Sequence, residues 1–169
     1  PPQGLDVLSE RDYQGPLIFR IDLNDEGPRP RRLDLVTPLF PRRLTPTPGR
    51  EPLLRFVSVA ARPDGEVIVL SSLGEVWTLT AGGDFSLLAR LPSGHYNRIS
   101  MPLAPDGSVF VSTGLHIREI FRVSVAGVVT TIARGLGDPE GIAVDRSGAL
   151  YVAETALLRI IRIAPVGRR

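Results

Sequence analysis

The chain has 169 residues, of which 43% are hydrophobic and 22% charged, so it is long enough for one domain with a buried core. Its net charge of +2 gives no bulk attraction to nucleic acid, and the absence of Cys excludes disulfides, thiolate metal sites and Cys nucleophiles. No apolar run in the sequence is long enough to span a membrane. The chain begins with Pro1-Pro2 and not with Met, so we expect it to be processed or excised from a longer polypeptide.

The N-terminal 36 residues predict short strands at Val7-Leu8, at residues 17–23 and at residues 32–36, which we interpret as an incomplete sheet. The following segment, 37–54, continues a stretch rich in Pro and Arg that starts at Pro28. Because Pro lacks a backbone donor, we expect most of this stretch to lie outside the sheets. Two interpretations stay open: a solvated loop beside an acidic N-terminal stretch, or an Arg-rich docking loop that uses Arg42 and Arg43.

From residue 55 onward the sequence repeats itself. Turn glycines at 65, 107 and 148 close the segments Pro63-Asp64-Gly65, Pro105-Asp106-Gly107 and Arg146-Ser147-Gly148. Each turn precedes a β-rich run, and similar runs follow at residues 76–79, 120–123 and 160–163. Units of roughly 40 to 50 residues with several strands each are typical of a β-propeller.

The repeats predict an all-β fold of four-stranded antiparallel blades, with no helix longer than a turn or two. We expect the first strands of the later units at residues 56–59, 99–103 and 142–144, and the fourth strands at residues 85–89 and 128–133. The predicted boundaries are an incomplete blade over 1–36, the Pro/Arg-rich insertion 37–54, complete blades over 55–91 and 98–134, and an incomplete blade over 138–165. About three and a half blades do not close a ring, so we expect a second copy, a protein partner or further blades to complete it.

One stretch makes the family resemblance specific: DPEGIAVDRSGALYVAE, followed by RIIRI, within residues 135–163. It resembles the NHL repeat and the SMP-30/gluconolactonase and strictosidine-synthase-like propellers. APDGSVFVSTG and RPDGEVIVL are looser versions of the same pattern. The resemblance implies a six-bladed type of ring whose ligands bind at the mouth of the central channel, but it does not fix function, because such families include scaffolds, lactonases and lyases.

The loops that enter the first strands, residues 51–55, 95–98 and 138–140, would border that channel. Resemblance to the gluconolactonase-like enzymes implies that Asn97 and Glu140 are ligands of Ca²⁺ or another divalent cation, with Glu140 in the place of the family's Asp and with no clear counterpart for a third ligand. The structural alternative is that Glu140 is a loop carboxylate that caps backbone amides. The segment LPSGHYNR also resembles PQQ-dependent sugar dehydrogenases, in which a His is the general base, and this makes His95 a second catalytic candidate beside Glu140.

The remaining polar residues have structural interpretations. Arg55, Tyr96 and Arg98 are candidate binding residues in the channel-entry loops, whereas His116 is expected to be exposed in a hairpin connection. Glu154 is expected to pair with Arg159 or Arg162 across a hairpin. The turn carboxylates Asp64, Asp106 and Asp145 are expected to accept hydrogen bonds from their own backbone.

The sequence therefore leads to three functional hypotheses. The first is a non-catalytic NHL-like binding or assembly module that requires no cofactor and engages a protein partner; the second is a divalent-metal-dependent lactonase-like hydrolase with a small-molecule ligand at the channel mouth. A PQQ-type dehydrogenase is the third. We expect no nucleic-acid partner, no transmembrane segment and an extracytoplasmic location, periplasmic or secreted.

Overall fold

In a computed structural model, the described residues are 18–21, 33–35, 55–80, 84–92 and 94–165. The chain forms two compact units, 1–55 and 56–169. In the first unit, β1 (Phe19–Ile21) and β2 (Leu33–Leu35) pair in antiparallel fashion. Both strands fall where the sequence predicts them, whereas Val7-Leu8 lies outside the described residues.

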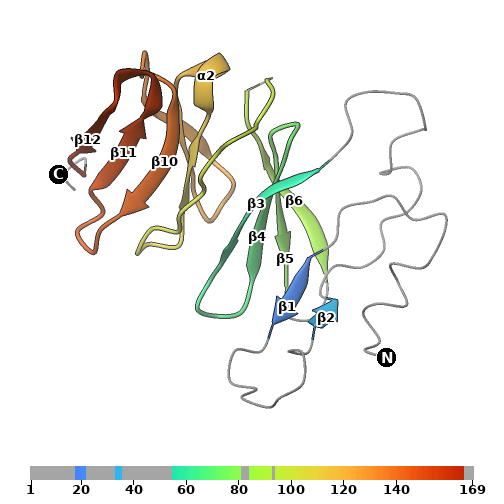
Figure 1. The fold of residues 1–169 in the computed structure, drawn as a ribbon. Coiled ribbons are helices and arrows are strands. Elements are labelled where there is room, and N and C mark those ends of the chain that lie inside the picture. The colour runs from blue at the N-terminus through green and yellow to red at the C-terminus, as the bar shows by residue number, and fades with distance from the viewer. Residues whose placement is uncertain (1–17, 22–32, 36–54, 81–83, 93, 166–169) are drawn as a thin grey trace, which may run out of the picture. The chain divides into compact units, whose positions relative to one another are not determined.

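The second unit begins with a complete blade, which we call blade I. Its strands β3 to β6 pair in sequence order, each antiparallel to the next, as Figure 1 shows. The predicted turn after β3 has Gly65 at φ +89°, a left-handed conformation that side-chain-bearing residues rarely adopt. The bounds are β3 Phe56–Ala61, β4 Val67–Ser71, β5 Glu75–Leu79 and β6 Phe85–Arg90.

Two three-stranded sheets follow, each with its strands in sequence order. Blade II comprises β7 (Val109–Ser112), β8 (Ile120–Val123) and β9 (Val129–Ala133). Blade III comprises β10 (Pro139–Val144), β11 (Leu150–Glu154) and β12 (Arg159–Ile163). These sheets confirm the predicted all-β class of a partial propeller.

The first strand expected in blade II, at residues 99–103, is reduced to a single bridge between Leu103 and Val109. The segment still runs beside β7, since the Ser112 and Phe110 amides donate to the carbonyls of Ser100 and Pro102 at 3.0 and 3.1 Å. Pro102 has no amide hydrogen, which removes one ladder bond and explains why a regular strand does not form.

Helical structure in the described residues is limited to two short pieces. The helix α2 (Gly114–Ile117) links β7 to β8, and the 3₁₀ turn η3 (Thr155–Leu157) links β11 to β12. Both pieces agree with the prediction of no helix beyond a turn or two. His116 is exposed in α2, as expected for a connection between strands.

Apolar side chains fill the space between consecutive blades. All four residues of β7 are buried, which agrees with a sheet covered on both faces. Each fully buried Ile, Leu or Val contributes roughly 1.5–3 kcal/mol relative to exposure. The core between blades I and II includes Ile68, Leu70, Val76, Tyr96, Met101, Val111 and Phe121, and that between blades II and III includes Phe110, Ile120, Leu136, Ile142, Leu150 and Val152.

Antiparallel pairing gives each blade two ends with different connections. We call the end with the Gly65, Gly107 and Gly148 hairpins the turn end. Its carboxylates Asp64, Asp106 and Asp145 accept hydrogen bonds from amides two residues further on, at 3.0, 3.1 and 2.8 Å, as predicted. We call the opposite end the loop end. It carries the connections between blades, at residues 91–98 and 134–138, together with α2 and η3.

Candidate functional site

At the loop end, two of the three expected channel-entry segments come together. They meet around Gly114, at the start of α2. A Cβ placed on Gly114 would lie 3.3 Å from the carbonyl oxygen of Asn97, 4.0 Å from that of Arg98 and 3.6 Å from Oδ1 of Asp138. Residues 51–54, of the third segment, lie outside the described residues. Arg55 is exposed.

Glu140 faces Arg98 across this cluster. Nη1 of Arg98 lies 3.9 Å from Oε1 of Glu140; the Arg98 side chain is 85% exposed and the Glu140 side chain 30%. An exposed pair of this kind contributes at most about 1 kcal/mol to stability. Its significance is that it places a guanidinium and a carboxylate next to each other at the loop end. The hydroxyl of Ser112, in β7, donates to the carbonyl oxygen of Glu140 at 2.6 Å and holds the start of β10 beside blade II.

Asp138 has a carboxylate oxygen with no hydrogen-bond partner among the described residues. Its Oδ1 is buried and accepts no hydrogen bond from a described residue. The backbone around it is unusual as well, because Arg98 (φ +50°), Gly114 (φ +60°) and Asp138 (φ +58°) are all left-handed. Such conformations in residues other than Gly cost about 1–3 kcal/mol and gather at functional sites. Sequence reasoning missed Asp138, because a residue between Gly and Pro is indistinguishable from ordinary turn chemistry.

Glu154 fixes the backbone next to Asp138. Its side chain is 1% exposed and accepts hydrogen bonds from the Gly137 amide at 2.6 Å and from Nε of Arg159 at 2.5 Å. The hydrogen bond from Arg159, followed by that from Gly137, lowers the pKa of the Glu154 carboxyl. The pair with Arg159 is confirmed, but its bridge to the Gly137 amide could not be seen in the sequence, since it links two separate loops.

Two neighbouring candidates differ in accessibility. His95 is exposed in the connection between blades I and II. Tyr96 is completely buried, and its hydroxyl donates to the carbonyl oxygen of Pro92 at 2.6 Å. Burial, and secondarily the charge of Glu119, raises the pKa of the Tyr96 phenol. Contact between Tyr96 and a ligand would therefore require this connection to open.

The expected metal pair of Asn97 and Glu140 stays a prediction, and one feature of the structure stands against it. The guanidinium of Arg98, 3.9 Å from the Glu140 carboxylate, would repel a cation placed between the two side chains. No three His, Cys, Asp or Glu side chains within the described ranges gather to hold a metal ion. Arg42 and Arg43, the candidate docking residues, lie outside the described part of the chain.

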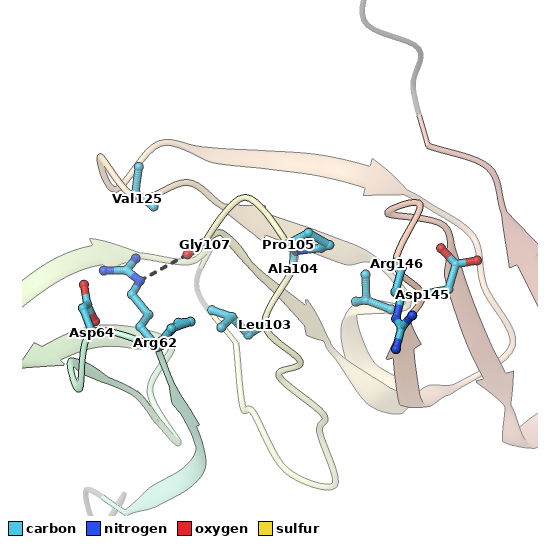
Figure 2. A pocket seen from close by; sticks show the side chains of 11 residues that line it. Arg62, Asp64, Leu103, Ala104, Pro105, Gly107, Val125, Asp145 and Arg146 are labelled. Atoms are coloured by element: carbon cyan, nitrogen blue, oxygen red, sulfur yellow. Dashed lines mark hydrogen bonds between the residues drawn. The ribbon is translucent and has the colours of Figure 1, made fainter.

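The turn end has a cavity of about 670 Å³, which no motif in the sequence predicts. Figure 2 shows Arg62 at one side of it, Leu103 and Ala104 between, and Arg146 on the other side. Nε of Arg62 donates to the Gly107 carbonyl at 3.2 Å, and Nη1 pairs with Glu66. The carboxylates at its edge, Asp64 and Asp145, accept hydrogen bonds from the amides of their own turns. The described lining of this cavity therefore offers no acid or base comparable with those at the loop end.

The blades and the loop end together define the class of the second unit, a β-propeller whose candidate site lies where successive blades connect. No protein-family model matches the sequence, and no curated protein matches it. No helix among the described residues is long and apolar enough to cross a membrane.

Several solved structures share the fold. A catalytically inactive virginiamycin B lyase from Staphylococcus aureus with quinupristin is similar with a TM-score of 0.58 and 18% identity, over 68% of this chain and 40% of that one. A protein assigned as a gluconolactonase is similar with a TM-score of 0.55 and 22% identity, over 69% of this chain and 46% of that one. A streptogramin B lyase is similar with a TM-score of 0.52 and 14% identity, over 67% of this chain and 41% of that one. The chain thus spans less than half of these structures, and at such identities the likeness shows the propeller fold alone.

Proposed function

We propose that this chain is part of a propeller enzyme that opens small cyclic esters, a lactonase-like hydrolase, with its site at the loop end. The observation that carries the proposal is that two successive blade connections bring Arg98 and Asp138 together at Gly114, and that Glu140, at the start of β10, lies 3.9 Å from the Arg98 guanidinium. The propellers with similar folds include a protein assigned as a gluconolactonase and two lyases, which supports a catalytic function over the binding module.

Glu140 and Arg98 supply complementary chemistry for this reaction. The half-exposed Glu140 carboxylate accepts a proton from water, the resulting hydroxide attacks the ester carbonyl carbon, and the ring C–O bond breaks. The departing alkoxide takes the proton back from Glu140. The Arg98 guanidinium stabilises the negative charge that develops on the carbonyl oxygen, and its planar donors suit a carboxylate product.

The test is hydrolysis of a panel of γ- and δ-lactones by wild-type chain, by Glu140→Gln and by Asp106→Asn, whose change lies at the turn end. We expect activity in wild type and Asp106→Asn, and a loss of 10²- to 10⁴-fold in kcat for Glu140→Gln, the usual contribution of a general base. Mass spectrometry of the product separates hydrolysis, which adds one water, from elimination, which does not. An unchanged rate in Glu140→Gln would remove Glu140 from the mechanism.

A second function, assembly, rests on a different observation. Among the described residues no strand pairs with the outer edge of β12, and the side chains of Leu158, just before it, and Ile160, within it, are 94% and 73% exposed, whereas blade I carries a fourth strand in the corresponding place. An uncovered strand edge with apolar side chains is a template for strand addition. We propose that a further strand or blade pairs with β12. Leu158→Lys combined with Ile160→Lys should then weaken self-association or partner binding in light scattering.

A further inference from the structure

We propose that a second cavity at the turn end, between blades II and III, binds a small monocarboxylate with an apolar body, such as a medium-chain alkanoate. The carboxylate pairs with Arg146, and the hydrocarbon chain lies among apolar side chains of both blades. We call this space the interblade cavity. It lies at the opposite end of the blades from the proposed lactonase site, and the inference does not rest on that proposal.

The interblade cavity has the size and the lining of a small-molecule site. Its volume is about 710 Å³, within the range of roughly 300–1,000 Å³ that ligand cavities have. Strands of both blades, β7 and β9 on one side and β11 and β12 on the other, contribute the apolar side chains Phe110, Ile132, Leu150 and Ile163. A hydrocarbon chain placed among these side chains leaves water, and this is the main driving force for binding apolar groups.

Three charged side chains line the interblade cavity, and two of them pair with each other. Nη2 of Arg122 donates to Oδ2 of Asp106 at 2.6 Å, and Nε of Arg122 donates to the Ser108 hydroxyl at 3.0 Å. The other carboxylate oxygen of Asp106 accepts hydrogen bonds from the amide and the hydroxyl of Ser108, at 3.1 and 2.6 Å. The charge of Asp106 is therefore balanced within the cavity wall.

Arg146 is the third charged side chain, and it is available to a ligand. It is exposed and makes no hydrogen bond or ion pair with a residue that the structure describes. It also lines the cavity shown in Figure 2, so it lies where the two cavities adjoin. The neighbouring carboxylate, Asp145, lines only the cavity of Figure 2 and accepts a hydrogen bond from the Ser147 amide at 2.8 Å. The charged side chains that line the interblade cavity thus sum to +1, which attracts an anion.

The lining also indicates which anion fits. The planar donors of a guanidinium match the two oxygens of a carboxylate, and a single negative charge balances the net charge of the lining. A phosphate monoester carries a charge of about −1.5 to −2. It would leave excess negative charge beside apolar walls, which is costly. A monocarboxylate with a hydrocarbon body therefore fits both the charged edge and the apolar interior.

The test is calorimetric titration of the full chain with sodium hexanoate, sodium octanoate and the neutral 1-octanol. Each further buried methylene should tighten binding by about fourfold, so octanoate should bind roughly 15-fold more tightly than hexanoate. Arg146→Gln should bind octanoate about fivefold more weakly, as expected for loss of an exposed ion pair, and should bind 1-octanol unchanged. The matched control is Arg134→Gln, which removes the same charge at the loop end and should bind octanoate like wild type.

A second variant tests the apolar wall. Ile132→Trp should weaken the binding of octanoate and of 1-octanol alike, because the indole occupies the space of the hydrocarbon chain. Ile132 is half-buried in β9, so thermal melting of this variant checks that it is folded. Arg146 is exposed, so Arg146→Gln should keep the fold, and its titration decides the proposal even if Ile132→Trp does not fold.

Four results would overturn the proposal. They are no heat with octanoate in wild type, no gain from hexanoate to octanoate, equal octanoate affinity in wild type and Arg146→Gln, and an equal loss in Arg134→Gln, which would mean attraction without a specific site. A loss in Arg98→Gln but not in Arg146→Gln would place the alkanoate at the loop end instead. Since no lactone is present in these titrations, their failure leaves the lactone assay unaffected, and the reverse also holds.

Discussion

Tyr96 should be the residue that anchors the site-bearing connection to the core. Its ring is wholly buried and fills the space over Gly74, where an added Cβ would meet the ring at 2.5 Å. Tyr96→Phe removes one hydrogen bond, to the Pro92 carbonyl, and should cost about 1 kcal/mol. Tyr96→Ala also empties the ring's cavity and should cost about 3–5 kcal/mol, as for other large aromatic truncations.

Urea denaturation followed by the fluorescence of Trp77, the single tryptophan, measures both losses. Trp77 stacks on Phe85 with ring centroids 5.0 Å apart, so its surroundings change on unfolding. The control is Tyr151→Phe, because that hydroxyl is exposed and 3.5 Å from Asp145, and it should change stability by under about 0.5 kcal/mol. Equal losses for Tyr96→Phe and Tyr96→Ala, or a loss below about 1 kcal/mol for Tyr96→Ala, would refute the anchoring role.

Three further perturbations test the fold. The raised pKa of Tyr96 predicts that wild-type stability falls as pH rises above 10, where the unfolded phenol loses its proton first, and that Tyr96→Phe shows a smaller fall in thermal melts. The hydrogen bond from the Ser108 hydroxyl lowers the pKa of Asp106 from 3.8 to about 2, so the stability that the Asp106 carboxylate contributes is present above pH 3.8 and lost as pH falls towards 2. Asp106→Asn should therefore flatten the dependence of Tm on pH between about pH 4 and pH 2, and an unaltered dependence would contradict this role of Asp106. In urea melts, Gly127→Ala should destabilise the chain by about 1–3 kcal/mol more than Gly135→Ala. Both glycines have a positive φ, but only at Gly127 would an added Cβ meet a backbone carbonyl oxygen, that of Leu88, at 2.3 Å.

The fold was predictable because the turns that separate its strands are specified by a few neighbouring residues. A turn of the Asp64-Gly65 kind specifies a hairpin through a few neighbouring residues, and the two spacings between such turns carry the period of the blade. The exception, residues 99–103, also has a local cause, since Pro102 removes one donor from the ladder. Its apolar pattern alone could not reveal that loss.

The site was harder to predict because its contacts are not local. Glu140 and Arg98 were found as separate members of two loops, but their pairing depends on how blades II and III pack. The unpartnered oxygen of Asp138 and the bridge from Glu154 to Gly137 arise from the same packing. Tyr96 shows the converse case: an aromatic in a channel-entry loop is a reasonable binding residue by sequence, and only the burial of its ring assigns it to the core.

A crystal structure of the chain with a lactam, a lactone analogue that resists hydrolysis, would locate the ester-binding site directly. We expect the lactam at the loop end, with its carbonyl oxygen within hydrogen-bonding distance of Arg98 and its ring beside Glu140. A lactam bound instead in the turn-end cavity, between Arg62 and Arg146, would contradict the proposed site.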